Sequence, residues 1–171
     1  MTLLNYFLNQ LEEEAAITRK FLTLLPEDQY QWQPHPKSMR LVVLATHIAE
    51  LPGWIPMALN TTELDFSVNA YKPTIVASNT ELLATFEKNL EEARTRLQIA
   101  DAAELAELWT LRDGDNIFFT TNKADVIRMS MSQQIHHRAQ LGVFLRLLNV
   151  PIPGSYGPSA DEMPIIEKAE V

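Results

Sequence analysis

The feature of this sequence that most constrains its fold is the helical spacing of apolar residues in four long segments. In the last of them, Leu141, Phe144 and Leu148 fall on one stripe at about 100° per residue, together with Gln133 and His137. A helix with one apolar stripe must bury that stripe against other elements. The pattern therefore predicts an all-α four-helix bundle, with helices near residues 3–25, 38–59, 78–99 and 122–149.

Local signals place the ends of these helices. Pro26 should end the first helix, and Asn149 followed by Pro151 should close the last one. Pro52 and Pro56 remove backbone donors from the second segment, so it either stops near Glu50 or continues past a kink. Side chains that can cap the four helices precede each segment: Thr2, Ser38, Ser78 in a capping box with Glu81, and Asn122 or Thr121.

The connections between the helices differ in character. Two β-prone runs, LWTL and IFFT, flank the dipeptide Asp113-Gly114, which predicts a small β-hairpin over residues 108–121, just before the last long helix. Residues 60–77 show no sustained period, so we expect an irregular crossover along the surface.

The chain length predicts one domain. With 171 residues, 46% of them hydrophobic, residues 1–171 suffice for a single domain with one core. The segment 150–171 should pack on the bundle as a structured cover, with Tyr156 packed against it and Asp161 or Glu162 capping a last short turn.

Charge and residue usage exclude several functions. The 14 Lys and Arg against 22 Asp and Glu give a formal charge of −8, so the basic footprint of a nucleic-acid-binding protein is missing. Without cysteine, the chain has no disulfide and no cysteine nucleophile, histidine is its only nitrogen ligand for a metal, and any thiol must come from outside.

The sequence also predicts a soluble protein. No apolar run approaches 18 residues, and the N-terminal region carries Glu12, Glu13 and Glu14, which we read as a solvated helix face. We therefore expect a cytoplasmic protein with no membrane partner.

Two histidines stand out because they share stripes with apolar residues. His47 lies on one stripe with Leu44, Leu51 and Trp54 in the second segment, as His137 does in the last. A buried imidazole without a partner costs about 1–3 kcal/mol, so each ring must find one. We expect His47 and His137 to meet at a shared polar site inside the bundle.

The other two histidines have less specific contexts. His35 lies in a loop between Pro34 and Pro36, where we expect a surface ring. His136 is rotated by about 100° from His137, so it should support the site from outside or contribute to an interface.

Three pieces of the sequence together resemble the DinB/YfiT-like family of bacterial four-helix-bundle proteins. They are WQPHPKSMRLVVLATHIAELPGW, ELWTLRDGDNIFF and QIHHRAQLGVFLRLLNVPIPGSYGPSADE. The resemblance implies a three-histidine site for a divalent metal, often nickel or zinc, with one histidine from the second helix and a His-x-x-x-His pair from the fourth. His47 matches the first ligand, and His137, followed by Arg138-Ala139-Gln140, matches the last.

The middle ligand position departs from the family pattern, because it holds Gln133. An amide oxygen is a weaker donor than imidazole for zinc or nickel. The three side chains could therefore hold a weakened metal site, or they could hydrogen-bond one another with no metal present. A carboxylate from Asp161 or Glu162 could fold over the site as an added ligand.

Two functions follow from these alternatives. In the first, the chain is a divalent-metal-binding protein with hydrolase or thiol-dependent transferase activity, since some relatives resemble transferases or isomerases that use mycothiol or bacillithiol. In the second, it is a catalytically degenerate member of the family that binds a small molecule or acts as a dimeric interaction module without metal.

Self-association is the testable prediction of the sequence. Apolar residues spread around more of the first and last helices than one core stripe needs: Leu3, Leu4, Phe7, Leu8, Val143, Leu145 and Leu147. A homodimer through these surfaces would bury them, and we expect sedimentation velocity to show a dimer at micromolar concentrations. A monomer at every concentration would contradict this prediction.

Overall fold

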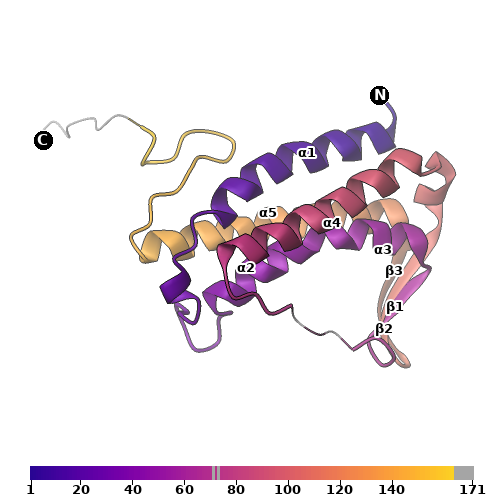
Figure 1. Ribbon diagram of the computed structural model, residues 1–171. Helices are drawn as coiled ribbons and strands as arrows, with labels where there is room; N and C mark the ends of the chain where they lie inside the picture. The colour runs from indigo at the N-terminus through magenta and orange to yellow at the C-terminus, as the bar shows by residue number, and fades with distance from the viewer. Residues whose placement is uncertain (71, 73, 164–171) are drawn as a thin grey trace, which may run out of the picture.

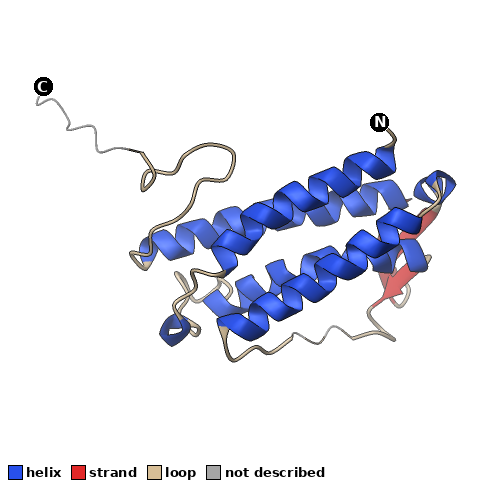
Figure 2. Ribbon diagram, turned by 45° about the horizontal axis from the view of Figure 1, so that its top comes forward, coloured by secondary structure: helices blue, strands red, loops and turns tan. Residues whose placement is uncertain are grey.

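The computed structural model describes residues 1–70, 72 and 74–163. Long helices run side by side, and a small sheet covers one end of the molecule (Figures 1 and 2). The α-helices are α1 (Leu3–Leu22), α2 (Leu41–Glu50), α3 (Trp54–Asn60), α4 (Asn79–Ile99) and α5 (Lys123–Leu147). Short 3-10 helices span Glu27–Gln29, Leu51–Gly53 and Ala102–Ala106.

Three of the four expected N-terminal caps are confirmed. The side chains of Thr2, Ser78 and Asn122 each accept a hydrogen bond from the backbone N–H three residues later. The cap at Ser38 is wrong, because α2 begins at Leu41. There, loop carbonyls satisfy the first free N–H groups: Leu41 donates to the carbonyl of Trp32 and Val42 to that of Tyr30.

The second helical segment is interrupted at its proline. α2 ends at Glu50, the turn Leu51–Gly53 contains Pro52, and α3 then continues the segment to Asn60. By length and composition this 20-residue stretch could cross a membrane, although His47, Glu50 and two prolines interrupt its apolar residues. More than half of it is buried against other parts of the chain, as in the core helix of a soluble protein.

The all-α expectation needs correction, because the described residues contain a three-stranded sheet. β2 (Leu108–Asp113) pairs antiparallel with β3 (Asn116–Asn122), and the turn between them uses Gly114 with a positive φ of 58°. β1 (Glu63–Asp65), from the stretch expected to be irregular, pairs parallel with β2. Three residues are too few to show an alternating pattern in the sequence.

Asp65 holds β1 to the turn of the sheet. Its carboxylate accepts hydrogen bonds from the N–H and hydroxyl of Ser67 and from the N–H of Gly114, at 2.7–3.0 Å. Arg112 lies 3.0 Å from the other carboxylate oxygen. The hydrogen bonds from Ser67 and Gly114, with Arg112, lower the pKa of Asp65 to about 2.

The hydrophobic core has two parts instead of the one expected. The larger part fills the space between the long helices, and the smaller consists of Ala58, Trp109 and Val126 between the sheet and the helices. Trp109 is fully buried and donates its indole N–H to the hydroxyl of Thr61 at 2.9 Å. The sheet is thus fixed to α3 and α5 by its own small core.

The buried stripe of α5 differs from the expected one by one residue. Gln134 and Arg138 are buried, whereas Gln133 is exposed and His137 is half-buried. Of the expected core residues, Leu141 is fully buried, and Phe144 and Leu148 are partly buried.

The stripe is offset because Arg138 pairs with a buried carboxylate of α1. Its Nη1 lies 2.7 Å from Oε2 of Glu14 and donates to the hydroxyl of Thr18 at 3.0 Å. Gln134 donates to the same hydroxyl. Reading Glu14 as part of a solvated face was therefore wrong, because only 2% of this residue is exposed.

The segment after α5 folds back onto the helices. The hydroxyl of Tyr156 donates to the carboxylate of Glu14 at 2.8 Å and accepts from Arg138 at 2.9 Å. The Tyr156 ring stays largely exposed, so only the hydroxyl enters the interior. Asp161 binds Arg146 and the N–H of Ile152. The rest of the expected cover, residues 164–171, lies outside the described residues.

Arg138→Met should destabilise the protein by about 3–5 kcal/mol, because it leaves the Glu14 carboxylate buried without a cation. The double variant Glu14→Met/Arg138→Met should recover much of this loss, since it removes both buried charges. Urea denaturation measures both free energies of unfolding. A double variant less stable than the single one would contradict this view of the pair.

Candidate functional site

The structure brings the three expected site residues to one cavity. His47 from α2 and Gln133 and His137 from α5 line a space of about 280 Å³ at the kink between α2 and α3. The remaining lining residues come from the kink, the sheet and α5: Leu51, Trp54, Leu111, Phe119, Val126, Met129 and Ser130. The sheet is therefore a wall of the site, which the sequence did not indicate.

The two imidazole rings are in direct contact. Their centroids lie 4.8 Å apart, with an angle of 75° between the planes. Both rings are half-buried at the edge of the core. Gln133 lines the same cavity from its exposed side, so the three residues share a site at the rim of the helices, not along their axis.

Gln140 determines which nitrogen of His137 carries the proton. Its amide nitrogen lies 3.0 Å from Nε2 of His136, and its oxygen lies 2.9 Å from Nδ1 of His137. An amide oxygen only accepts, so Nδ1 of His137 must be the donor. In the neutral ring, Nε2 then keeps its lone pair available for a ligand.

His136 supports the site from outside, because its Nε2 lies within hydrogen-bonding distance of the Gln140 amide nitrogen. This agrees with one of the two roles that the sequence suggested for His136. Sequence reasoning missed the role of Gln140. The signal was present in the spacing, since Gln140 follows His136 by four residues and His137 by three, which places all three on one helix surface.

The pKa of His47 is lowered from 6.5. Burial is the main cause, the neighbouring His137 adds to it, and Glu50 opposes it. His47 is therefore neutral at pH 7 and has a lone pair to offer. Neutral imidazole is the form that binds a metal ion or accepts a hydrogen bond.

The cavity offers two imidazoles and one amide as candidate ligands for a metal ion. Within the part of the chain that the structure describes, no three His, Cys, Asp or Glu side chains gather into a metal-binding group. Asp161 is bound to Arg146, and Glu162 accepts the N–H of Ser159, so neither lies over the cavity as an added ligand. His35 is exposed in its loop, where its Nδ1 accepts the N–H of Lys37.

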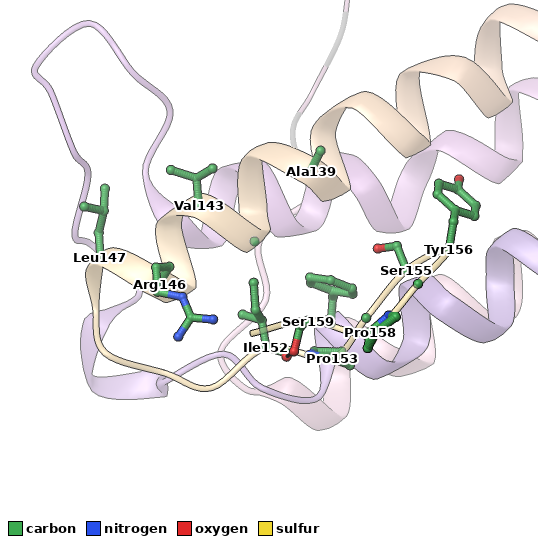
Figure 3. A pocket seen from close by; sticks show the side chains of 14 residues that line it. Ala139, Val143, Arg146, Leu147, Ile152, Pro153, Ser155, Tyr156, Pro158 and Ser159 are labelled. Atoms are coloured by element: carbon green, nitrogen blue, oxygen red, sulfur yellow. Dashed lines mark hydrogen bonds between the residues drawn. The ribbon is translucent and has the colours of Figure 1, made fainter. Parts of the chain in front are cut away.

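A larger cavity of about 560 Å³ lies elsewhere, between α5 and residues 152–159 (Figure 3). Its arginine and its tyrosine are engaged: Arg146 with Asp161, and the Tyr156 hydroxyl with Glu14 and Arg138. The smaller cavity at the histidines is the better candidate, because its polar groups converge and keep free lone pairs.

Comparison with known proteins identifies the family and the fold of this chain. The family model described as "DinB family" matches residues 1–169. The chain belongs to the DinB family. The uncharacterized protein YrdA of Bacillus subtilis (strain 168) is 26% identical over 163 residues, which cover 93% of this chain and 91% of YrdA.

Solved structures of DinB-like proteins share the fold. The Bacillus subtilis protein YjoA superimposes with a TM-score of 0.69 at 15% identity, covering 88% of this chain and 97% of YjoA. A Bacillus cereus protein gives 0.67 at 18% identity, covering 88% and 95%. A protein from Exiguobacterium sibiricum 255-15 gives 0.66 at 15% identity, covering 95% and 99%.

His47 should titrate below pH 6.5 in an NMR titration of the histidine rings. Because folding lowers this pKa, the unfolded chain binds more protons, and the stability contributed by the neutral ring is complete above pH 6.5. That stability should decline as the pH falls toward the pKa of the folded state.

His137→Gln should raise the midpoint of His47, because it removes the repulsion between two protonated rings. His35→Gln is the matched control and should leave the midpoint unchanged, since His35 is exposed in a separate loop. A wild-type midpoint at or above 6.5 would show that burial does not lower the pKa of His47.

Proposed function

We propose that this DinB-family protein binds a divalent metal, nickel or zinc, through His47 and His137, with Gln133 as a weaker third ligand. The contact between two half-buried imidazoles in one cavity is the observation that supports this best. The lowered pKa of His47 reduces competition from protons at pH 7.

The cavity suits metal-assisted hydrolysis or thiol-dependent transfer. A divalent ion lowers the pKa of a bound water or thiol, so that the nucleophile forms at neutral pH. Within the chain, Gln140 holds the ring of His137 in one tautomer, as a hydrogen-bonded partner of a metal ligand does. Trp54, Leu111 and Phe119 cover the histidines with apolar surface and limit the access of water.

A second candidate function is small-molecule binding without metal. The amide at position 133 favours it, because Gln133 is exposed and is a poor ligand for nickel or zinc. In that case the imidazole nitrogens of His47 and His137 would accept hydrogen bonds from the ligand itself. With this function, the protein would be a catalytically degenerate member of the family.

We also propose that the protein is cytoplasmic and forms a homodimer through exposed apolar residues of α1 and α5. Leu3 and Tyr6 on α1 and Val143 and Leu147 on α5 are each about half exposed, at 47–59%. Phe7 and Leu145, expected from the sequence to contribute, are buried in the core and cannot.

Calorimetric titration with nickel and zinc tests the metal site on protein purified without a histidine tag. Gln133→His should raise the affinity by about tenfold or more, because it supplies a third imidazole on the same helix face. His137→Ala should abolish binding. His35→Ala is the matched control and should bind as the wild type does. Equal, negligible binding by the wild type and Gln133→His would end the metal hypothesis.

A further inference from the structure

The walls of the histidine cavity are mostly apolar. None of the ten lining residues is Asp, Glu, Lys or Arg, and six have apolar or aromatic side chains: Leu51, Trp54, Leu111, Phe119, Val126 and Met129. Ser130 is already engaged, because its hydroxyl donates to the carbonyl of Leu51 at 2.7 Å. The two histidines and Gln133 are therefore the residues that can accept a hydrogen bond from the polar part of a ligand.

No cation of the surrounding elements is free to pair with a negatively charged ligand. Every Lys and Arg of α2, α3, β2, β3 and α5 already lies beside a carboxylate: Arg112 with Glu63 and Asp65, Lys123 with Glu107, Arg128 with Asp125, Arg138 with Glu14, and Arg146 with Asp161. The net charge of −8 disfavours anions further.

A second hollow on the other side of His137 has the same character. It measures about 340 Å³ and is lined by uncharged residues: Ser38, Met39, Leu44, Gln140, Val143 and Phe144, besides His137. A carboxylate placed in the histidine cavity would lose its hydration without gaining a Lys or Arg partner, which is costly. The walls thus disfavour ligands that carry an ionised group in the part that the cavity encloses.

We propose that the cavity binds a small molecule with an uncharged, apolar body and one hydroxyl or thiol group directed at His47 and His137. This inference rests on the proposed function for the position of the polar group and adds the chemical class of the ligand. The hydroxyl or thiol donates to an imidazole lone pair, while Trp54, Leu111 and Phe119 enclose the body. The proposed ligand class excludes thiols that also carry a carboxylate, since the cavity walls offer a carboxylate no Lys or Arg partner.

Three phenols with the same hydroxyl group test the proposal: p-cresol, 4-hydroxybenzamide and 4-hydroxybenzoate. They differ only in the group at the far end of the ring, which is apolar, neutral and polar, or ionised. Calorimetry or ligand-observed NMR should show p-cresol binding about tenfold or more tightly than 4-hydroxybenzoate, with the amide between them. Equal binding of p-cresol and 4-hydroxybenzoate, or no binding of p-cresol, would overturn the proposal.

A charge introduced into the wall should reverse this preference. Leu111→Lys places a cation in the half-buried wall and should strengthen 4-hydroxybenzoate binding relative to p-cresol. Phe118→Lys is the matched control, because this residue of β3 is 53% exposed and does not line the cavity. Met129→Lys repeats the test from α5 if Leu111→Lys fails to fold. Equal effects of wall and control variants would contradict the proposal.

Titrations in EDTA and with zinc separate this inference from the metal hypothesis. If p-cresol binds selectively in EDTA and zinc does not bind, the metal hypothesis fails and the ligand class stands. If zinc binds but p-cresol and 4-hydroxybenzoate bind with equal affinity, both in EDTA and with zinc, the ligand class fails and the metal site stands.

Discussion

The buried ion pair between Glu14 and Arg138 determines how α5 is rotated in this protein. Two charges that are each 98% removed from solvent are tolerated only as a pair with further hydrogen bonds, which Thr18 and Tyr156 supply. With Arg138 directed at α1, His137 is turned by about 100° toward α2, where it meets His47. The position of the histidine site therefore depends on a pair that does not belong to the site.

The sequence predicted the elements that depend on local signals. The caps at Thr2, Ser78 and Asn122 and the end of the last helix before Asn149 are all properties of short stretches, and the structure confirms them. The association of His47 with His137 was also predictable, because their spacing relative to apolar residues placed both rings near the core. Even so, apolar spacing located the stripe of α5 one residue away from its true position. A buried ion pair adds no apolar residue to the pattern. The apolar spacing therefore predicts that Gln133 faces the core, whereas Gln134 does.

The features that the sequence did not indicate depend on partners distant in the chain. β1 exists because Glu63 to Asp65 pair with β2, almost 50 residues later. The start of α2 depends on carbonyls of the preceding loop, which make a cap at Ser38 unnecessary. The cavity wall formed by Leu111 and Phe119 also depends on distant partners. These side chains reach the histidine cavity because the sheet packs against the helices through Trp109.

We propose that His47 and His137 form one ligand site whose imidazole lone pairs are available to a divalent ion. Anomalous diffraction from a crystal soaked in nickel tests it most directly, because it locates the ion without reference to activity. We predict an anomalous peak between the rings of His47 and His137 that is strengthened by Gln133→His. Nickel bound only at exposed residues such as His35, with no peak between the two rings in either protein, would contradict the claim.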